Sequence, residues 1–423
     1  MTSLSGKIAW NTLSQIIGKA ASSSLGLVIA AILKRYLGPE DFGLFTFVSV
    51  FVLMFGTLAD WGLNLISVRE ASRSTSRAAE IIGNVLVLRL LLSVVAATLA
   101  VVAIHLLPYD SQTRLLVSVA SPALIVLSLK TSFQIIFQTK LEMHNWALSE
   151  ITTNLVVVLL LLAVVSLGGS VLAIVLVFLA GHLAAAAVAA VLGYRLLPLK
   201  FSLAQPNTRY LLWESLPMGG ILVMFTIYNR IDTLIISLYQ GQAAVGFYGA
   251  AYRIFEVLVL GAAYFANSVL PLISKLAQED LYSLGMVYRK SFLVLLLLGT
   301  TVAIANFIFA PLAIFLLGGE EYSGSVLPLR ILSLALIVSY FNHLNGYTLI
   351  ALGKQWYSLA IALLALLVNV GLNLILIPTY SYPAAALVTF ITEALIVVLS
   401  LWVVRKTLGP NLNLGGLRSL LWR

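Results

Sequence analysis

The chain lacks cysteine, has only four histidines, and carries charge on just 10% of its 423 residues. Without cysteine it cannot form disulfides, thiolate metal sites or a thiol nucleophile. The histidines share no metal-ligand spacing, and no phosphate-cradling glycine loop ending in Lys-Ser/Thr is present. These absences argue against ATP-driven transport and metal catalysis by this chain alone, and no cofactor and no metal are expected.

Apolar residues dominate what is there. They make up 61% of the chain, and charged residues make up only 10%. Soluble domains carry charge on about 25% of their residues. About 20 helical residues cross a hydrocarbon core. Apolar runs between Gly, Pro and charged breaks predict an all-α, polytopic membrane protein with twelve transmembrane helices. The expected spans are 7–33, 42–67, 78–107, 113–138, 147–168, 170–193, 210–239, 243–275, 284–317, 325–351, 355–377 and 382–404.

The distribution of Lys and Arg over the connecting segments indicates the orientation. Sixteen of the 25 fall on one side of the expected spans and four on the other. Cytoplasmic loops are enriched in these residues, so both termini are expected in the cytoplasm and the chain in the inner cell membrane. Topology also explains the net charge of +9, and no nucleic-acid partner is expected.

Two parts of the chain resemble each other at an offset of 203 residues. Residues 36–38 and 43–45 (YLG and GLF) align with 239–241 and 246–248 (YQG and GFY). A chance register in so biased a composition is the alternative. The repeat predicts two parallel six-helix bundles, residues 1–200 and 201–423. Duplicated halves that rock against each other are typical of alternating-access transporters and favour transport over catalysis.

Nine charged side chains lie well inside the expected spans, away from their ends, where each costs at least about 2.5 to 3.5 kcal/mol to insert. The cations are Lys19, Arg89, Lys130, Arg230 and Arg253, and the anions are Asp60, Asp232, Glu256 and Glu393. Arginine binds phosphate through a planar fork and stays charged when desolvated. A cavity lined by Arg89, Arg230 and Arg253, with Lys19, would suit a pyrophosphate or an acidic sugar.

The intramembrane anions have two interpretations, local pairing with a cation and ion coupling. Arg253 and Glu256 are three apart on one helix face and could simply pair locally, whereas Arg230 and Asp232 point to different faces, so at least one needs a partner elsewhere. Asp60, Asp232, Glu256 and Glu393 are the candidates for ion coupling.

Two asparagines, Asn369 and Asn373, lie four apart on one helix face. Interhelical hydrogen bonding is the commoner use of such residues. We therefore expect them to hold helices together rather than to bind a ligand.

Four stretches resemble polysaccharide flippases of the Wzx type, whose superfamily also contains MATE multidrug exporters and lipid II flippases. They are residues 35–45 (RYLGPEDFGLF), 229–232 followed by 246–248, 369–378 and 384–386. The family's usual Gly before the last stretch is replaced by Tyr382-Pro383. The resemblance implies a V-shaped pair of six-helix bundles around a cationic cavity, working by alternating access.

The function implied is movement of a polyprenyl-diphosphate-linked oligosaccharide from the inner to the outer leaflet. A polysaccharide polymerase or synthase would be a further partner. The alternatives are a multidrug or small-solute antiporter and a polyprenyl-dependent glycosyltransferase or polymerase. An enzyme is disfavoured because the expected outer loops, the longest near Glu40 and Glu320, are short.

Overall fold

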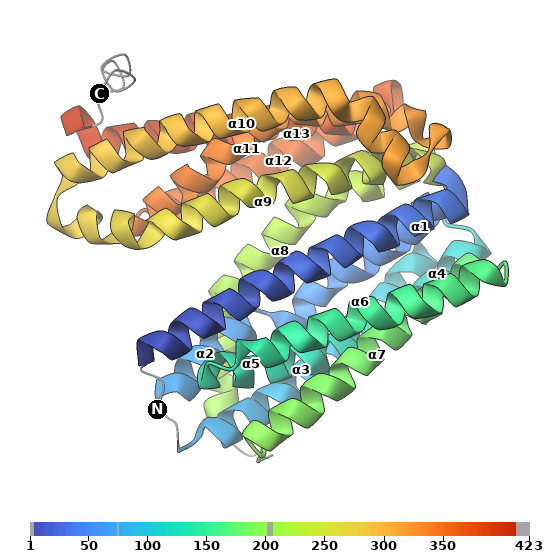
Figure 1. The fold of residues 1–423 in the computed structure, drawn as a ribbon, viewed down its shortest axis with the longest axis horizontal. Helices are drawn as coiled ribbons and strands as arrows, with labels where there is room; N and C mark the ends of the chain where they lie inside the picture. Colours follow the sequence, from blue (N-terminus) through green and yellow to red (C-terminus); the bar gives the residue numbers. More distant parts are fainter. Residues whose placement is uncertain (1–3, 74–75, 201–205, 412–423) are drawn as a thin grey trace. The chain divides into compact units, whose positions relative to one another are not determined.

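The computed structural model describes residues 4–73, 76–200 and 206–411, and every element in these ranges is helical. The expected all-α membrane fold is confirmed (Figure 1). The α-helices are α1 (Leu4–Asp60), α2 (Leu63–Arg73), α3 (Ala78–Leu106), α4 (Ser111–Ala120), α5 (Ala123–Lys140), α6 (Met143–Ser166), α7 (Val171–Leu196), α8 (Pro206–Gln240), α9 (Gln242–Glu279), α10 (Leu281–Gly318), α11 (Val326–Ala351), α12 (Gln355–Tyr380) and α13 (Tyr382–Leu408). Two short 3-10 helices, η1 (Glu320–Ser325) and η2 (Gly409–Asn411), follow α10 and α13.

The chain forms two compact units. The first holds Met1–Leu37 and Leu44–Arg230, and the second holds Gly38–Gly43 and Ile231–Arg423. The unit boundary lies inside α8, thirty residues beyond the division expected from the repeat. The expected division into two six-helix bundles stays a prediction.

Eleven helical stretches of the described chain are long and apolar enough to cross a membrane, one fewer than expected. The difference lies in α1, which contains the first two expected spans. They meet at a single non-helical residue, Gly38, with φ 68° and ψ 178°. The outer loop expected near Glu40 is therefore wrong, because Glu40 already belongs to the second arm of the helix.

Two expected spans are also interrupted. The helix expected over 42–67 stops at Asp60, because Trp61 and Gly62 both have positive φ, and α2 begins afresh at Leu63. The helix expected over 113–138 divides into α4 and α5 at Ser121 and Pro122. Proline lacks the amide hydrogen that an uninterrupted helix needs, which explains the second break.

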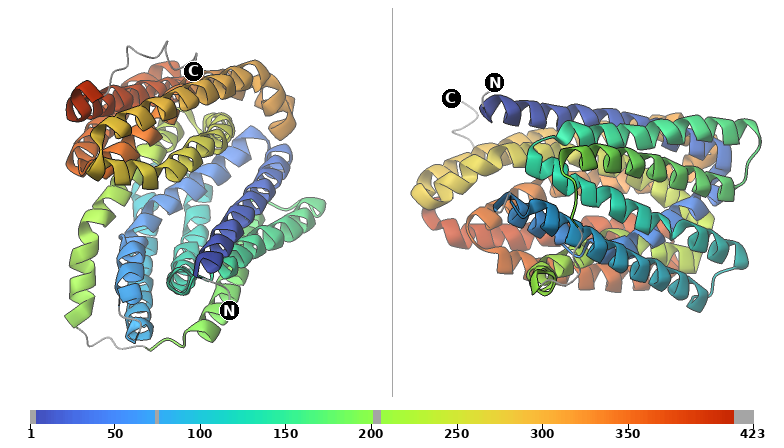
Figure 2. Two further views of the ribbon diagram at one scale, coloured as in Figure 1. Left: turned by 60° about the vertical axis from the view of Figure 1, so that its left-hand side comes forward. Right: turned by 90° about the horizontal axis from the view of Figure 1, so that it is seen from below.

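In the first unit, α3, α5 and α7 enclose an apolar core together with α2. Glycines let neighbouring elements approach closely: Gly181 of α7 lies against the Thr153 carbonyl of α6. The first arm of α1 lies beside α6, where Gly18 meets Ala147 (Figures 1 and 2). In the second unit α11 packs against α9, α10 and α13, and α12 packs against α13.

The repeated motif has one conformation in both copies. Gly241 has φ 80° and ψ −178°, close to the values of Gly38. Both copies contribute to the second unit and pack reciprocally: a Cβ on Gly43 would lie 1.7 Å from the Gln242 carbonyl oxygen, and one on Gly246 would lie 2.0 Å from that of Pro39. The offset of 203 converts each contact into the other, so the segments cross with local two-fold symmetry.

Candidate ion and substrate site

Arg89 of α3 is the most deeply buried arginine of the candidate set, with 3% of its surface exposed. Its Nη2 lies 3.1 Å from Oδ1 of Asp60, at the end of α1, and donates to the Thr131 hydroxyl of α5 at 2.7 Å. Among the described residues, Nε and Nη1 have no hydrogen-bond partner, and both are buried. Two predicted site residues, Arg89 and Asp60, are thus brought together, and the guanidinium keeps unused donors.

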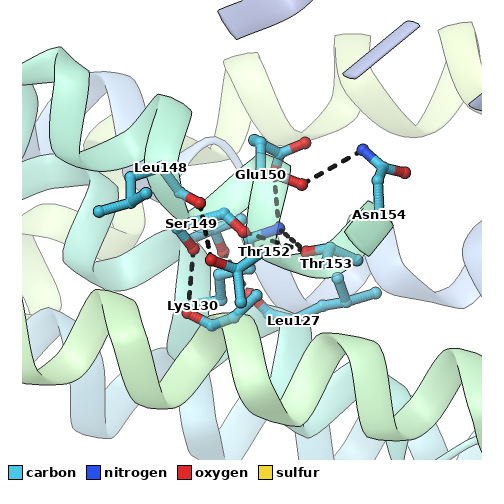
Figure 3. A network of polar contacts seen from close by, with 10 residues as sticks. Leu127, Lys130, Leu148, Ser149, Glu150, Thr152, Thr153 and Asn154 are labelled. Atoms are coloured by element: carbon cyan, nitrogen blue, oxygen red, sulfur yellow. Dashed lines mark hydrogen bonds and ion pairs between the residues drawn. The ribbon is translucent and has the colours of Figure 1, made fainter. Parts of the chain in front are cut away.

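Lys130 of α5 anchors a second polar cluster. Its Nζ lies 2.5 Å from Glu150 Oε1 and 3.3 Å from the Thr153 hydroxyl, and 5.0 Å from the centre of the Trp146 ring, all on α6. Figure 3 shows Lys130 reaching across to Glu150 and Thr153. Lys130 thus has a carboxylate, a hydroxyl and an aromatic ring as partners.

The two clusters of the first unit share α5 and the same distribution of charge. Thr131, which bonds Arg89, directly follows Lys130. In each pair the cation is buried and the carboxylate is partly exposed, 33% for Asp60 and 35% for Glu150. The carboxylates are therefore the more exposed members of the two pairs.

Asp232 begins a chain of buried polar groups in the second unit. The carboxylate is 4% exposed, accepts a hydrogen bond from the Tyr248 hydroxyl of α9, and accepts another from the Thr233 amide at 2.7 Å. The Tyr248 hydroxyl also lies 3.5 Å from the Thr389 hydroxyl of α13. Asp232 thus connects three helices.

Asn369 and Asn373 continue this chain on α12. Asn373 donates to Asn369 Oδ1 at 3.0 Å, and Asn369 donates to the Thr392 hydroxyl of α13 at 3.4 Å. The latter bond is the interhelical contact expected of these residues. Oδ1 of Asn373 is buried and has no hydrogen-bond partner in the described part of the chain. The chain therefore ends in an unused oxygen acceptor.

Glu393 of α13 accepts hydrogen bonds from two side chains of α11. Its Oε2 accepts from the Ser339 hydroxyl at 2.9 Å and from Asn342 Nδ2 at 2.5 Å. These donors stabilise the carboxylate.

The remaining predicted residues do not all converge. Arg253 Nη1 lies 3.4 Å from Glu256 Oε2, the local pairing that their spacing allowed, with Arg253 48% exposed. Arg230 is partly buried and ends the first unit, whereas Asp232 belongs to the second. The side chain of Lys19 lies outside the described residues.

Sequence reasoning missed the partners of the buried cations. Glu150 lies near the start of its expected span and was not counted among the nine intramembrane charges, although buried Lys130 requires an anion nearby. Tyr248 lies in the repeated motif at 246–248, but the motif does not identify it as the partner of Asp232, and Thr389 carries no signal of its own. Helix rotation decides which side chains meet Asp232.

Two family models match the chain. One, described as polysaccharide biosynthesis protein, matches residues 6–277, and the MatE model matches residues 217–375. An uncharacterized membrane protein of Methanocaldococcus jannaschii, MJ1375, is 25% identical over 197 residues, which span 45% of each chain. The match thus spans less than half of that relative's length.

Solved structures with the same fold include two transporters. One is the lipid II flippase MurJ in an inward closed conformation, with a TM-score of 0.77, 16% identity and coverage of 96% of this chain and 91% of the other. The other is an inward-facing multidrug resistance MATE family transporter of the MOP superfamily, with a TM-score of 0.76, 16% identity and coverage of 94% and 96%. At this identity the likeness shows the fold alone.

Proposed function

The chain belongs to the polysaccharide biosynthesis protein family, and on that premise we propose that it flips a polyprenyl-diphosphate-linked oligosaccharide from the inner to the outer membrane leaflet. The family and fold are those of membrane transporters rather than enzymes. The lipid tail stays in the bilayer while the head group crosses by alternating access. Both termini are cytoplasmic in this proposal, and a polysaccharide polymerase or synthase consumes the product.

The observation that carries the proposal is Arg89. A guanidinium 3% exposed inside a membrane unit, with two nitrogens lacking hydrogen bonds, is costly to maintain and suited to a phosphate. We propose that Lys19, Arg230 and Arg253 join Arg89 in attracting the diphosphate and acidic sugars.

Ion coupling would use the carboxylates of the candidate set. Asp60 forms an ion pair with Arg89, so an ion that neutralises Asp60 would free the guanidinium to bind the substrate. Asp232 supplies a buried oxygen at one end of a polar chain whose other end is Asn373 Oδ1. Glu256 and Glu393 are further candidates in the second unit.

A small-solute or multidrug antiporter is the second candidate. The MatE match over residues 217–375 favours it, as does the carboxylate of Glu393, which accepts hydrogen bonds on α11. Carboxylates suit a cationic solute better than a diphosphate.

Complementation separates the two functions. The chain is expressed in bacteria that lack their own polysaccharide flippase, as wild type, Arg89→Ala, Arg230→Ala and Arg253→Ala at equal membrane levels. Arg77→Ala is the matched control, because Arg77 precedes α3 outside the expected spans and is exposed. We expect surface glycan with the wild type and Arg77→Ala, and at least about a tenfold loss with Arg89→Ala. Failure in several hosts together with gained drug resistance would favour the antiporter.

A further inference from the structure

The cluster around Lys130 has no role in the function proposed above, yet it pairs a buried cation with a carboxylate and a hydroxyl of the next helix. It joins α5 to α6 at the level where α6 is also tied to α7. Ser149 donates to the Ala185 carbonyl at 2.9 Å, and Gly181 lies against the Thr153 carbonyl. The cluster therefore sits where three helices meet.

The two members of the pair differ in access. The Lys130 side chain is 4% exposed and the Glu150 side chain is 35% exposed. Glu150 also lies about two turns from the start of α6, so a proton has a shorter path to Glu150 than to the buried ammonium. Once Glu150 is protonated, the Lys130 ammonium is left buried with a hydroxyl and an aromatic ring as partners, and a buried cation without an anion is strongly disfavoured.

The surroundings provide no replacement anion for Lys130 among the described residues. His182 of α7 interacts electrostatically with both members, and its buried Nδ1 has no hydrogen-bond partner. Arg89, with Asp60, reaches α5 at Thr131. From α1, Lys19 is the residue after the contact with α6, and its side chain lies outside the described part.

We propose that Lys130 and Glu150 form a proton-for-anion exchange site. The Glu150 carboxylate takes up one proton and becomes a neutral acid, while Lys130 keeps its own proton and exchanges the carboxylate oxygen for a phosphate oxygen. Release of the anion lets Glu150 lose the proton and pair again. This inference rests on the proposed function for the identity of the anion, the diphosphate of the polyprenyl carrier.

The exchange predicts that binding of a diphosphate takes up a proton, because ligand and proton are linked through one carboxylate. The probe is farnesyl diphosphate, added to the full chain in lipid nanodiscs in weak buffer with a pH-indicator dye. Farnesol, which lacks the diphosphate, corrects for insertion of the tail. We expect uptake of about one proton per molecule bound.

Glu150→Gln should bind farnesyl diphosphate with no proton uptake. Glu142→Gln is the matched control, because Glu142 is equally exposed at 35%, precedes the same helix, and pairs with His144 instead. Retained uptake in Glu150→Gln would overturn the proposal, as would binding by the wild type with no uptake. Binding by the wild type without proton uptake is also the result expected if the proton on Glu150 comes from Lys130 instead of from solution.

A measurement without ligand tests the proton site independently of the flippase function. On acidification, the infrared band of a protonated carboxyl group should appear in the wild type, decrease in Glu150→Gln and stay in Glu142→Gln. If the wild type does not bind farnesyl diphosphate, the polyprenyl-diphosphate substrate and the anion half of the exchange both fail. The infrared band then decides the proton half: a band unchanged in Glu150→Gln overturns it. The double variant Lys130→Met/Glu150→Gln, which carries neither charge, is the control for folding. If this variant folds, loss of the infrared band or of proton uptake does not come from unfolding.

Discussion

At the scale of single residues, the Lys130–Glu150 pair makes an asymmetric prediction about stability. Glu150→Gln leaves an ammonium that is 4% exposed without its anion, at an expected cost of about 3 to 5 kcal/mol. Lys130→Met leaves a carboxylate that already has access to solvent, so its cost should be lower. Thermal unfolding of the purified protein measures both.

The double variant Lys130→Met/Glu150→Gln should recover much of the stability lost in Glu150→Gln, because a neutral pair replaces an uncompensated charge. If the double variant instead loses as much stability as the two single variants together, the pair does not stabilise the unit as one interaction.

A second residue, Asp110, predicts a dependence on pH. It caps α4 by accepting hydrogen bonds from the Gln112 amide at 3.1 Å and the Thr113 amide at 3.4 Å. The Thr113 hydroxyl, which donates to the carboxylate, is the main cause that lowers the pKa of Asp110 below its ordinary value. A lowered pKa means stability that is present above the unfolded-state value of about 3.9 and lost as the pH falls through the folded-state value.

Asp110→Ala should therefore lower stability by about 0.5 to 2 kcal/mol at neutral pH. The difference from the wild type should shrink below about pH 4, where the carboxylate becomes protonated. Thermal melts of both proteins between neutral and acidic pH measure it. Asp110→Asn keeps an acceptor oxygen and is the control; an equal loss at neutral pH in this variant would contradict capping as the cause.

At the scale of elements, the crossing of the two repeated motifs predicts an intolerant glycine. A Cβ on Gly43 would lie 1.7 Å from a backbone oxygen, which cannot move aside as a flexible side chain would. Gly43→Ala should cost about 3 kcal/mol or more, at the upper end of overpacking. Gly371→Ala in α12 is the control, because no atom lies within 4 Å of the added carbon. Equal yields and melting temperatures for the two variants would contradict the close crossing.

The elements themselves were largely predictable from the sequence, because hydropathy reports length and polarity directly. The breaks were less so. An outer loop was expected near Glu40, yet one residue with positive φ, Gly38, suffices to turn the helix. Trp61 interrupts an apolar run with a conformation that its residue type does not favour, and it packs against Gly219 in the structure.

The candidate site was predictable only in its ingredients. Charged residues in apolar runs identified Arg89, Asp60, Asp232 and Glu393, since burial of charge has a recognisable cost. Their partners depend on how each helix is rotated, which composition does not encode. Thr131, Glu150 and Tyr248 became partners through that rotation.

At the scale of the whole molecule, the absence of cysteine allows a direct test of orientation. The Lys and Arg distribution predicts that the start of α4 faces outward and the end of α9 faces the cytoplasm. Gln112→Cys and Gln278→Cys are a matched pair, because both glutamines are exposed at the ends of helices. A membrane-impermeant maleimide applied to intact cells should label Gln112→Cys alone, and both variants once the cells are opened. Labelling of Gln278→Cys alone in intact cells would show the opposite topology and contradict the proposed direction of transport.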